Sequence, residues 1–129
     1  MNNFFDSNIL LYLVEDIPKT VLAENLSRQG GTISVQVLNE FVSVCRKIHK
    51  LEFSDIVNLL LPIKETFRIV DVTIETHERA MEIAMTNKIG IYDANIVAAA
   101  ELAGCDTLYT EDLSDGQRIG RVTIRNPFM

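Results

Sequence analysis

The segment "GIYDANIVAAAELAGCDTLYTED", residues 90–112, predicts a buried helix followed directly by a strand. At about 100° per residue, Ile96 and Val97 fall on one apolar stripe of a helix expected over residues 92–103. Asp93 lies on that stripe too, although an unpaired buried carboxylate costs several kcal/mol or takes up a proton. We therefore expect this acid to face something that the fold brings to it.

Apolar segments of strand length alternate with amphipathic helical segments along the chain. This alternation predicts one α/β domain, residues 1–129, with a mainly parallel sheet covered by helices on both faces. Ligands of such sheets bind beyond the carboxyl ends of the strands, where the strand order reverses. The strands are expected at 2–6, 32–35, 67–72, 106–110 and 122–124. The helices are expected at 18–29, 36–49, 74–86 and 92–103, with another that begins at a Ser54 cap and bends or ends at Pro62.

The composition is that of a globular chain. Of the 129 residues, 47% are apolar and 23% are charged, and no apolar run approaches the roughly 20 residues that cross a bilayer. The N-terminus lacks the basic start and small-residue cleavage site of a secretory signal. Cys45 and Cys105 lack metal-ligand spacing. These features predict a cytoplasmic protein without membrane association, with two buried free thiols.

The charge balance argues at first against a nucleic-acid partner. Lys plus Arg number 12 and Asp plus Glu number 18, which gives a net charge of −6. Phosphate attraction normally requires a basic surface. The objection weakens only if some of the carboxylates are committed to cations.

Four acids are expected at one edge of the sheet. Asp6 ends the first strand, Glu40 lies one helical turn after the second, Asp93 opens the helix before the fourth, and Asp112 follows the fourth. Two carboxylates 5 Å apart repel each other by about 3 kcal/mol at an effective dielectric constant near 20. Mg²⁺ and Mn²⁺ prefer carboxylate oxygens, and such a cation makes bound water acidic enough to attack a phosphodiester. The pattern favours a cation site for phosphodiester hydrolysis.

A simpler interpretation stays open for each acid taken alone. The negative charge of Asp93 would interact favourably with the positive end of its helix dipole, and Asp6 would cap the turn after the first strand. Periodicity and composition do not decide between a site and separate capping or solvated groups.

Four segments together resemble the PIN domain, and in particular the VapC-like toxin ribonucleases of toxin–antitoxin pairs. They are "FFDSNILLY", "ISVQVLNEFVSV", "IYDANIVAAAELAGCDTLYTEDLSDGQRI" and "IRNPF", and they cover nearly the whole chain in order. The resemblance implies a five-stranded sheet of order 3-2-1-4-5. The strand order then reverses between the first and fourth strands.

The resemblance also implies roles for the four acids. Asp6 matches the first acid of a D-[TS]-N motif, Glu40 that of N-E, Asp93 that of W/Y-D-A, and Asp112 that of T-x-D. Together they would hold one or two Mg²⁺ or Mn²⁺ ions, directly or through water. Activated water would then cut RNA, leaving a 5′-phosphate and a 3′-hydroxyl.

Neighbouring polar residues follow the same pattern. Ser7 stands where threonine is commoner and keeps the hydroxyl, whereas Asn8 and Thr110 match polar positions that orient the acids or metal-bound water. Asn95 departs from the leucine that usually follows "DA". Because the helical wheel turns it away from Asp93, we predict an effect on packing or on a partner surface rather than on catalysis.

The acidic loop offers two alternative ligands, Glu111 and Asp115, although the T-x-D match favours Asp112. Lys47, seven residues after Glu40 on the same side of its helix, is a candidate for contacting RNA phosphates together with Arg46. Solvated surface charge is the alternative interpretation of both basic residues.

The resemblance implies two protein partners. One is a second copy of the chain, with the apolar helices 18–29 and 36–49 as candidate dimer surfaces. The other is a VapB-like antitoxin whose C-terminal segment covers the acidic crevice, often through an arginine.

Two other functions compete with this interpretation. A receiver domain would use Asp71 as its phosphoacceptor, but it needs a lysine near the last strand and none follows Lys88. A non-catalytic or housekeeping PIN domain would bind RNA or protein without cutting, although a binding module has no reason to gather mutually repelling acids.

Overall fold

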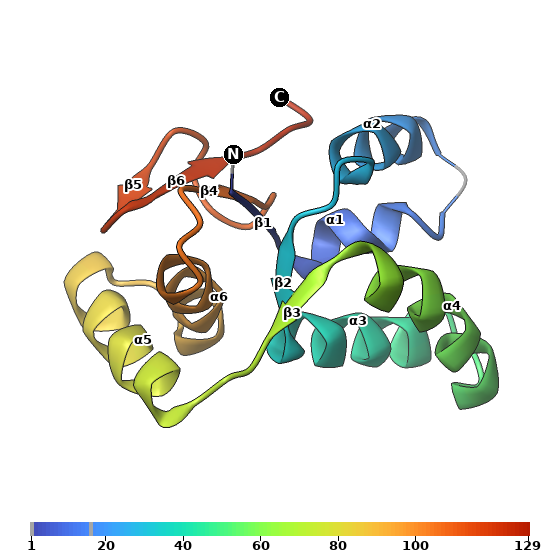
Figure 1. Cartoon of the computed structure of the whole chain (residues 1–129), viewed down its shortest axis with the longest axis horizontal. Coiled ribbons are helices and arrows are strands. Elements are labelled where there is room, and N and C mark those ends of the chain that lie inside the picture. Colours follow the sequence, from blue (N-terminus) through green and yellow to red (C-terminus); the bar gives the residue numbers. More distant parts are fainter. Residues whose placement is uncertain (1, 16) are drawn as a thin grey trace.

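A mainly parallel sheet runs through the centre of the computed structural model, which describes residues 2–15 and 17–129 (Figure 1). The strands are β1 (Asn3–Phe5), β2 (Thr32–Ser34), β3 (Arg68–Val70), β4 (Thr107–Tyr109), β5 (Arg118–Ile119) and β6 (Val122–Arg125). The helices are α1 (Ser7–Tyr12), α2 (Pro18–Ser27), α3 (Val35–Lys47), α4 (Phe53–Thr66), α5 (Ile74–Asn87) and α6 (Ile91–Leu102). The predicted α/β class is confirmed.

The strand order is β3-β2-β1-β4-β6-β5, with every neighbouring pair parallel except β5 and β6. The expected order holds for the first five positions, because the strand predicted at 122–124 is β6. The count of five strands is wrong, since β5 adds a sixth at the edge. Its two residues in the segment "DGQRIGR" are too few to produce a visible alternation.

Helices flank the central strands. In Figure 1, α5 and α6 lie to the left of β2 and β3, and α1 to α4 lie to the right. The long α6 contacts β2, β4 and β6 as well as α5, and α3 packs against α1. No helix in the described parts of the chain is both long and apolar enough to cross a membrane.

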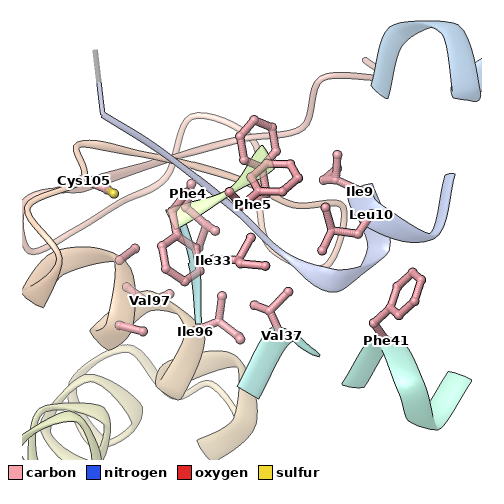
Figure 2. Packing of buried hydrophobic residues seen from close by; sticks show 14 of the residues in the cluster. Phe4, Phe5, Ile9, Leu10, Ile33, Val37, Phe41, Ile96, Val97 and Cys105 are labelled. Atoms are coloured by element: carbon pink, nitrogen blue, oxygen red, sulfur yellow. The ribbon is translucent and has the colours of Figure 1, made fainter. Parts of the chain in front are cut away.

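The core explains why α6 is nearly all apolar. Phe4 and Phe5 of β1 are fully buried and point to opposite faces, as successive strand residues do. Figure 2 shows Val97 of α6 beside Phe4, and Ile9 and Leu10 of α1 beside Phe5. Two faces of one central strand are therefore covered by helices that carry or adjoin the predicted acids.

Three local predictions are corrected. The helix α1 was not expected, because its apolar residues, 9–12, fill only about one turn and are too few to show a helical period. Ser54 is not the cap of α4, which begins at Phe53 after Glu52. Pro62 lies inside α4 rather than ending it, because buried Leu60 and Ile63 hold both of its sides against the core.

The apolar face expected on residues 18–29 does not enter the core as a whole. Val21 and Leu22 of α2 are exposed, whereas the small residues Ala23 and Ser27 are buried. Large apolar side chains are thus left on the surface of α2, a helix that we considered for a dimer interface.

The free thiols and the receiver-domain alternative are also decided by the fold. Cys45 and Cys105 are buried and free, as predicted.

Asp71 follows β3, which is the edge strand of the sheet, and is exposed. A receiver phosphoacceptor needs the carboxyl end of a central strand, so Asp71 lies in the wrong place for that role.

Candidate active site

Three neighbouring strands bring the predicted site together. Because β2, β1 and β4 are adjacent and parallel, their carboxyl ends lie at the same edge of the sheet. Asp6 follows β1, α3 begins directly after β2, and the segment Thr110–Asp112 follows β4. The Asp6 N–H donates to the carbonyl oxygen of Tyr109 at 3.0 Å, which joins the ends of β1 and β4.

Asp6 lies at the centre of this edge and is only 4% exposed. It is the N-cap of α1: its Oδ1 accepts a hydrogen bond from the Ser7 N–H at 2.7 Å. Its Oδ2 accepts a hydrogen bond from the Thr110 hydroxyl at 2.9 Å. The cap and the convergence of acids, which were alternatives for the sequence alone, therefore occur at the same residue.

The Asp6 carboxyl is held in an unfavourable environment for a charge. Burial raises its pKa to about 7, although the hydrogen bonds from the Ser7 N–H and the Thr110 hydroxyl lower it, and the charges of Glu40 and Asp112 raise it further. Near neutral pH both the protonated and the ionised forms of Asp6 are therefore populated. A positive charge beside it would favour the ionised form.

Glu40 projects from α3 toward the same place. Its Oε1 accepts a hydrogen bond from the Ser7 hydroxyl at 3.4 Å, and its Oε2 accepts one from the Gln36 amide at 3.5 Å. Burial raises the pKa of the Glu40 carboxyl, these two hydrogen bonds lower it, and the charges of Asp93 and Asp112 raise it. Ser7 thus bridges the first two acids.

Asp93 turns out to face another acid. It lies in the first turn of α6 and is partly buried. Burial raises the pKa of its carboxyl, and the charge of Asp112 adds to the effect. Within the described residues no salt bridge engages Asp93. The fold therefore supplies no cation to the carboxylate that the helix aims inward.

Burial and neighbouring acids raise the pKa values of Asp6, Glu40 and Asp93, but the four acids do not form a ready-made coordination shell. In residues 2–15 and 17–129, no three His, Cys, Asp or Glu side chains converge closely enough to hold a metal ion. The donor set nevertheless fits a hard divalent cation, because it consists of carboxylates whose charge is uncompensated. Side-chain rearrangement of the exposed Asp112 and the part-buried Glu40 and Asp93 would be needed to close the site.

The polar residues beside the acids fix the loop after β4. The Asn8 amide donates to the Thr110 hydroxyl oxygen at 3.2 Å, and the Asp112 N–H donates to the same oxygen at 3.1 Å. Asn8 Oδ1 accepts a hydrogen bond from the Glu111 N–H at 3.4 Å. The side chains of Asn8 and Thr110 therefore hold the backbone that carries Asp112.

Glu111, one alternative ligand, is engaged elsewhere. Its Oε1 accepts a hydrogen bond from the Tyr12 hydroxyl at 2.6 Å, and its Oε2 forms an ion pair with Lys19 at 2.8 Å. The Lys19 ammonium lies 5.1 Å from the centroid of the Phe128 ring. Sequence reasoning missed the roles of Tyr12 and Lys19 because neither is one of the motif acids or their polar neighbours, and both lie more than ninety positions from Glu111.

Asp115, the other alternative, also has a structural partner. Its Oδ1 accepts a hydrogen bond from the Asn126 N–H at 2.8 Å, which ties the loop to the end of β6. The two predicted basic residues differ as well. Arg46 donates to the carbonyl oxygen of Leu51 at 3.0 Å and lies over the ring of Phe53, whereas Lys47 is exposed and lines the same open depression as Glu40.

Asn95 is part-buried on α6, and its Oδ1 is fully buried with no hydrogen-bond partner among the described residues. Leaving such an oxygen without a donor costs about 1–3 kcal/mol. We predict that Asn95→Leu stabilises the protein by about 1 kcal/mol, because it removes the unpaired oxygen and buries apolar surface. Urea unfolding measures this change. Altered cleavage with unchanged stability and assembly would contradict the prediction.

The chain was compared with known proteins. The PIN domain family matches residues 4–118. No curated protein matches the chain. A toxin–antitoxin complex from Klebsiella pneumoniae contains a chain that is 25% identical, with a TM-score of 0.73 and 98% of each chain covered.

Two further solved structures share the fold at lower identity. VapBC-1 from nontypeable Haemophilus influenzae is 20% identical, with a TM-score of 0.75 and all of both chains covered. VapC20 of Mycobacterium tuberculosis, a toxin that cleaves the sarcin–ricin loop, is 18% identical, with a TM-score of 0.70 over 86% of this chain and 90% of that one. Since the family match spans most of the sequence, and its neighbours in fold are VapC toxins, the chain belongs to the PIN domain family.

Proposed function

We propose that this protein is a metal-dependent endoribonuclease, a VapC-like toxin that hydrolyses RNA phosphodiester bonds. The observation that carries the proposal is the set of acids at the carboxyl edge of the sheet, where burial and neighbouring acids raise the pKa values of Asp6, Glu40 and Asp93. A protein that only bound RNA or another protein would lose stability from this repulsion without any gain in function. The family match and the toxin–antitoxin neighbours support the same activity.

The proposed ligands of one or two divalent ions are Asp6, Glu40, Asp93 and Asp112. When bound, Mg²⁺ or Mn²⁺ supplies charge neutralisation at the phosphate and acidification of water. Asp6 is already immobilised through both of its oxygens. The other three acids are less buried, which leaves them free to adjust around a phosphate.

The polar residues beside the acids would position the carboxylates. Ser7 spans Asp6 and Glu40, and Asn8 and Thr110 hold the loop that presents Asp112. The depression beside Glu40 is open, so a polymer can enter it from solvent. These features suit an extended phosphodiester better than a small enclosed substrate.

A cleavage assay on total RNA tests the proposal. The purified protein is expected to cut RNA in Mg²⁺ or Mn²⁺, to stop when EDTA is added, and to leave 5′-phosphate ends. Cleavage that continued in EDTA would contradict metal dependence. RNA binding without any cleavage under these conditions would favour the non-catalytic PIN domain instead.

We also propose a VapB-like antitoxin, a homodimer and a cytoplasmic location. The acidic edge suits an arginine from the antitoxin. An apolar cavity of about 280 Å³, lined in part by Leu13, Leu59 and Phe67, suits its apolar side chains. The exposed Val21 and Leu22 of α2 support a second copy as partner.

A further inference from the structure

An open depression of about 410 Å³ adjoins Glu40 and is otherwise lined by residues that are not proposed metal ligands. Glu40 is the single proposed ligand on its wall. The other lining residues are polar or aromatic: Gln36, Asn39, Ser43, Lys47 and Tyr92. The depression therefore begins at the proposed site and extends away from it over the surface of α3.

Tyr92 is the aromatic group in this depression and is 70% exposed. It immediately precedes Asp93 at the start of α6. Among the described residues, its ring stacks on no other ring and meets no cation. By contrast, the exposed ring of Phe53 is covered by the Arg46 guanidinium 4.4 Å from its centroid. Tyr92 thus offers an unused aromatic face next to the acids.

Lys47 lies at the far end of the same depression. The positions of Glu40, Ser43 and Lys47 follow the spacing of one helical face, and the rise of α3 separates the first from the last by about 10 Å. A nucleic-acid strand that passes Glu40 along this face would bring a later phosphate to the ammonium of Lys47. Ser43 lies between them along α3, whereas the amide groups of Gln36 and Asn39 line the depression before Glu40.

We propose that this depression binds a single-stranded part of the RNA next to the cleaved bond, with an unpaired base stacked on Tyr92 and a phosphate on Lys47. The inference rests on the proposed function and assigns Tyr92 and Lys47 of this chain to the binding of that RNA. Stacking of a base on an aromatic side chain needs an unpaired base, and it tolerates different sequences. A paired duplex would keep its bases away from the ring.

Steady-state cleavage of a labelled single-stranded oligonucleotide in Mn²⁺ tests the roles of both residues. Tyr92→Ser is expected to raise KM about tenfold with kcat nearly unchanged, because it removes uniform binding energy. Tyr92→Phe keeps the ring and should keep most of the affinity. Lys47→Gln should weaken binding and reduce the slope of log affinity against log salt by about one.

Matched controls lie away from the depression. Phe53→Ser removes another exposed ring, and Lys64→Gln removes an exposed cation from α4, so both should behave as the unmodified protein. If Tyr92→Ser and Phe53→Ser gave the same KM, or if a duplex of the same sequence were cut as efficiently, the inference would be overturned.

A binding measurement separates this inference from the nuclease proposal. The chain has no tryptophan, so Tyr92→Trp creates a single fluorescent reporter at the depression. Single-stranded RNA in EDTA and low salt is expected to quench it, and duplex RNA is not. Quenching of the Trp fluorescence without cleavage in Mn²⁺ would contradict the nuclease proposal alone. Cleavage without quenching of the Trp fluorescence would contradict the stacking inference alone.

Discussion

Asp93→Asn is expected to lower the rate of RNA cleavage by roughly two to three orders of magnitude, because it removes one of the proposed charged ligands while keeping the shape of the side chain. Asp93 lies in the first turn of α6 and is engaged by no salt bridge within the described residues. The charge of Asp112 raises its pKa in addition to burial. The metal-free variant should be at least as stable as the unmodified protein, since one repulsive charge is gone.

A matched variant tests the simpler explanation of Asp93. Asp55 also occupies the first turn of a helix, α4, and is exposed. If Asp93 served only the helix dipole, Asp55→Asn and Asp93→Asn would each cost about 0.3–1 kcal/mol and leave cleavage intact. We expect Asp55→Asn to behave in that way and Asp93→Asn to lose cleavage. Initial rates on one labelled RNA, at saturating Mn²⁺, distinguish the outcomes. If the Asp93→Asn protein cut RNA at the rate of the unmodified protein, Asp93 would not be a ligand that cleavage needs.

The arrangement of the sheet could be predicted because its signals are local and repeated. Each strand is a short apolar run between helical segments, and parallel pairing then follows from the alternation. The missed elements are those without such a signal. The strand β5 has two residues, and the apolar residues of α1 fill only about one turn, so neither the strand period nor the helix period is visible in the sequence.

The acids could be selected from sequence, but their surroundings could not. Asp93 stands out because a charge interrupts an apolar stripe, and Asp6 because it ends a buried strand. The contacts of Glu111 with Tyr12 and Lys19 depend on side chains that meet only after the whole sheet has formed. Nothing in the local sequence of Tyr12 or Lys19 marks them as partners of that loop. The metal-binding role of the four acids stays a prediction.

Asp6 is expected to destabilise the metal-free protein more and more as the pH rises from about 4 to about 7. Its pKa in the folded protein is about 7, against 3.8 for an ordinary aspartate, mainly because it is buried. The folded state therefore holds a proton that the unfolded state has already released. Stability falls through this interval and levels off above the folded pKa, with a ceiling of about 4 kcal/mol.

The substitution Asp6→Asn isolates this effect. Urea unfolding in EDTA should show little gain for the variant near pH 4, where Asp6 is protonated in the folded state and about half protonated in the unfolded state. The gain should grow to roughly 2–4 kcal/mol at pH 8, reduced by any weakening of the hydrogen bonds from Ser7 and Thr110. A gain that did not change with pH would mean that the Asp6 carboxyl titrates normally.

Divalent cations should reverse the difference at pH 8. At a Mn²⁺ concentration one hundred times its dissociation constant, the unmodified protein is expected to gain about 2.7 kcal/mol. Asp6→Asn should gain much less, because it lacks the most buried of the four carboxylates. Asp71→Asn is a suitable control, since this exposed acid follows the edge strand β3 and should leave the Mn²⁺ response unchanged. An equal response to Mn²⁺ in the unmodified and Asp6→Asn proteins would show that the cation binds elsewhere.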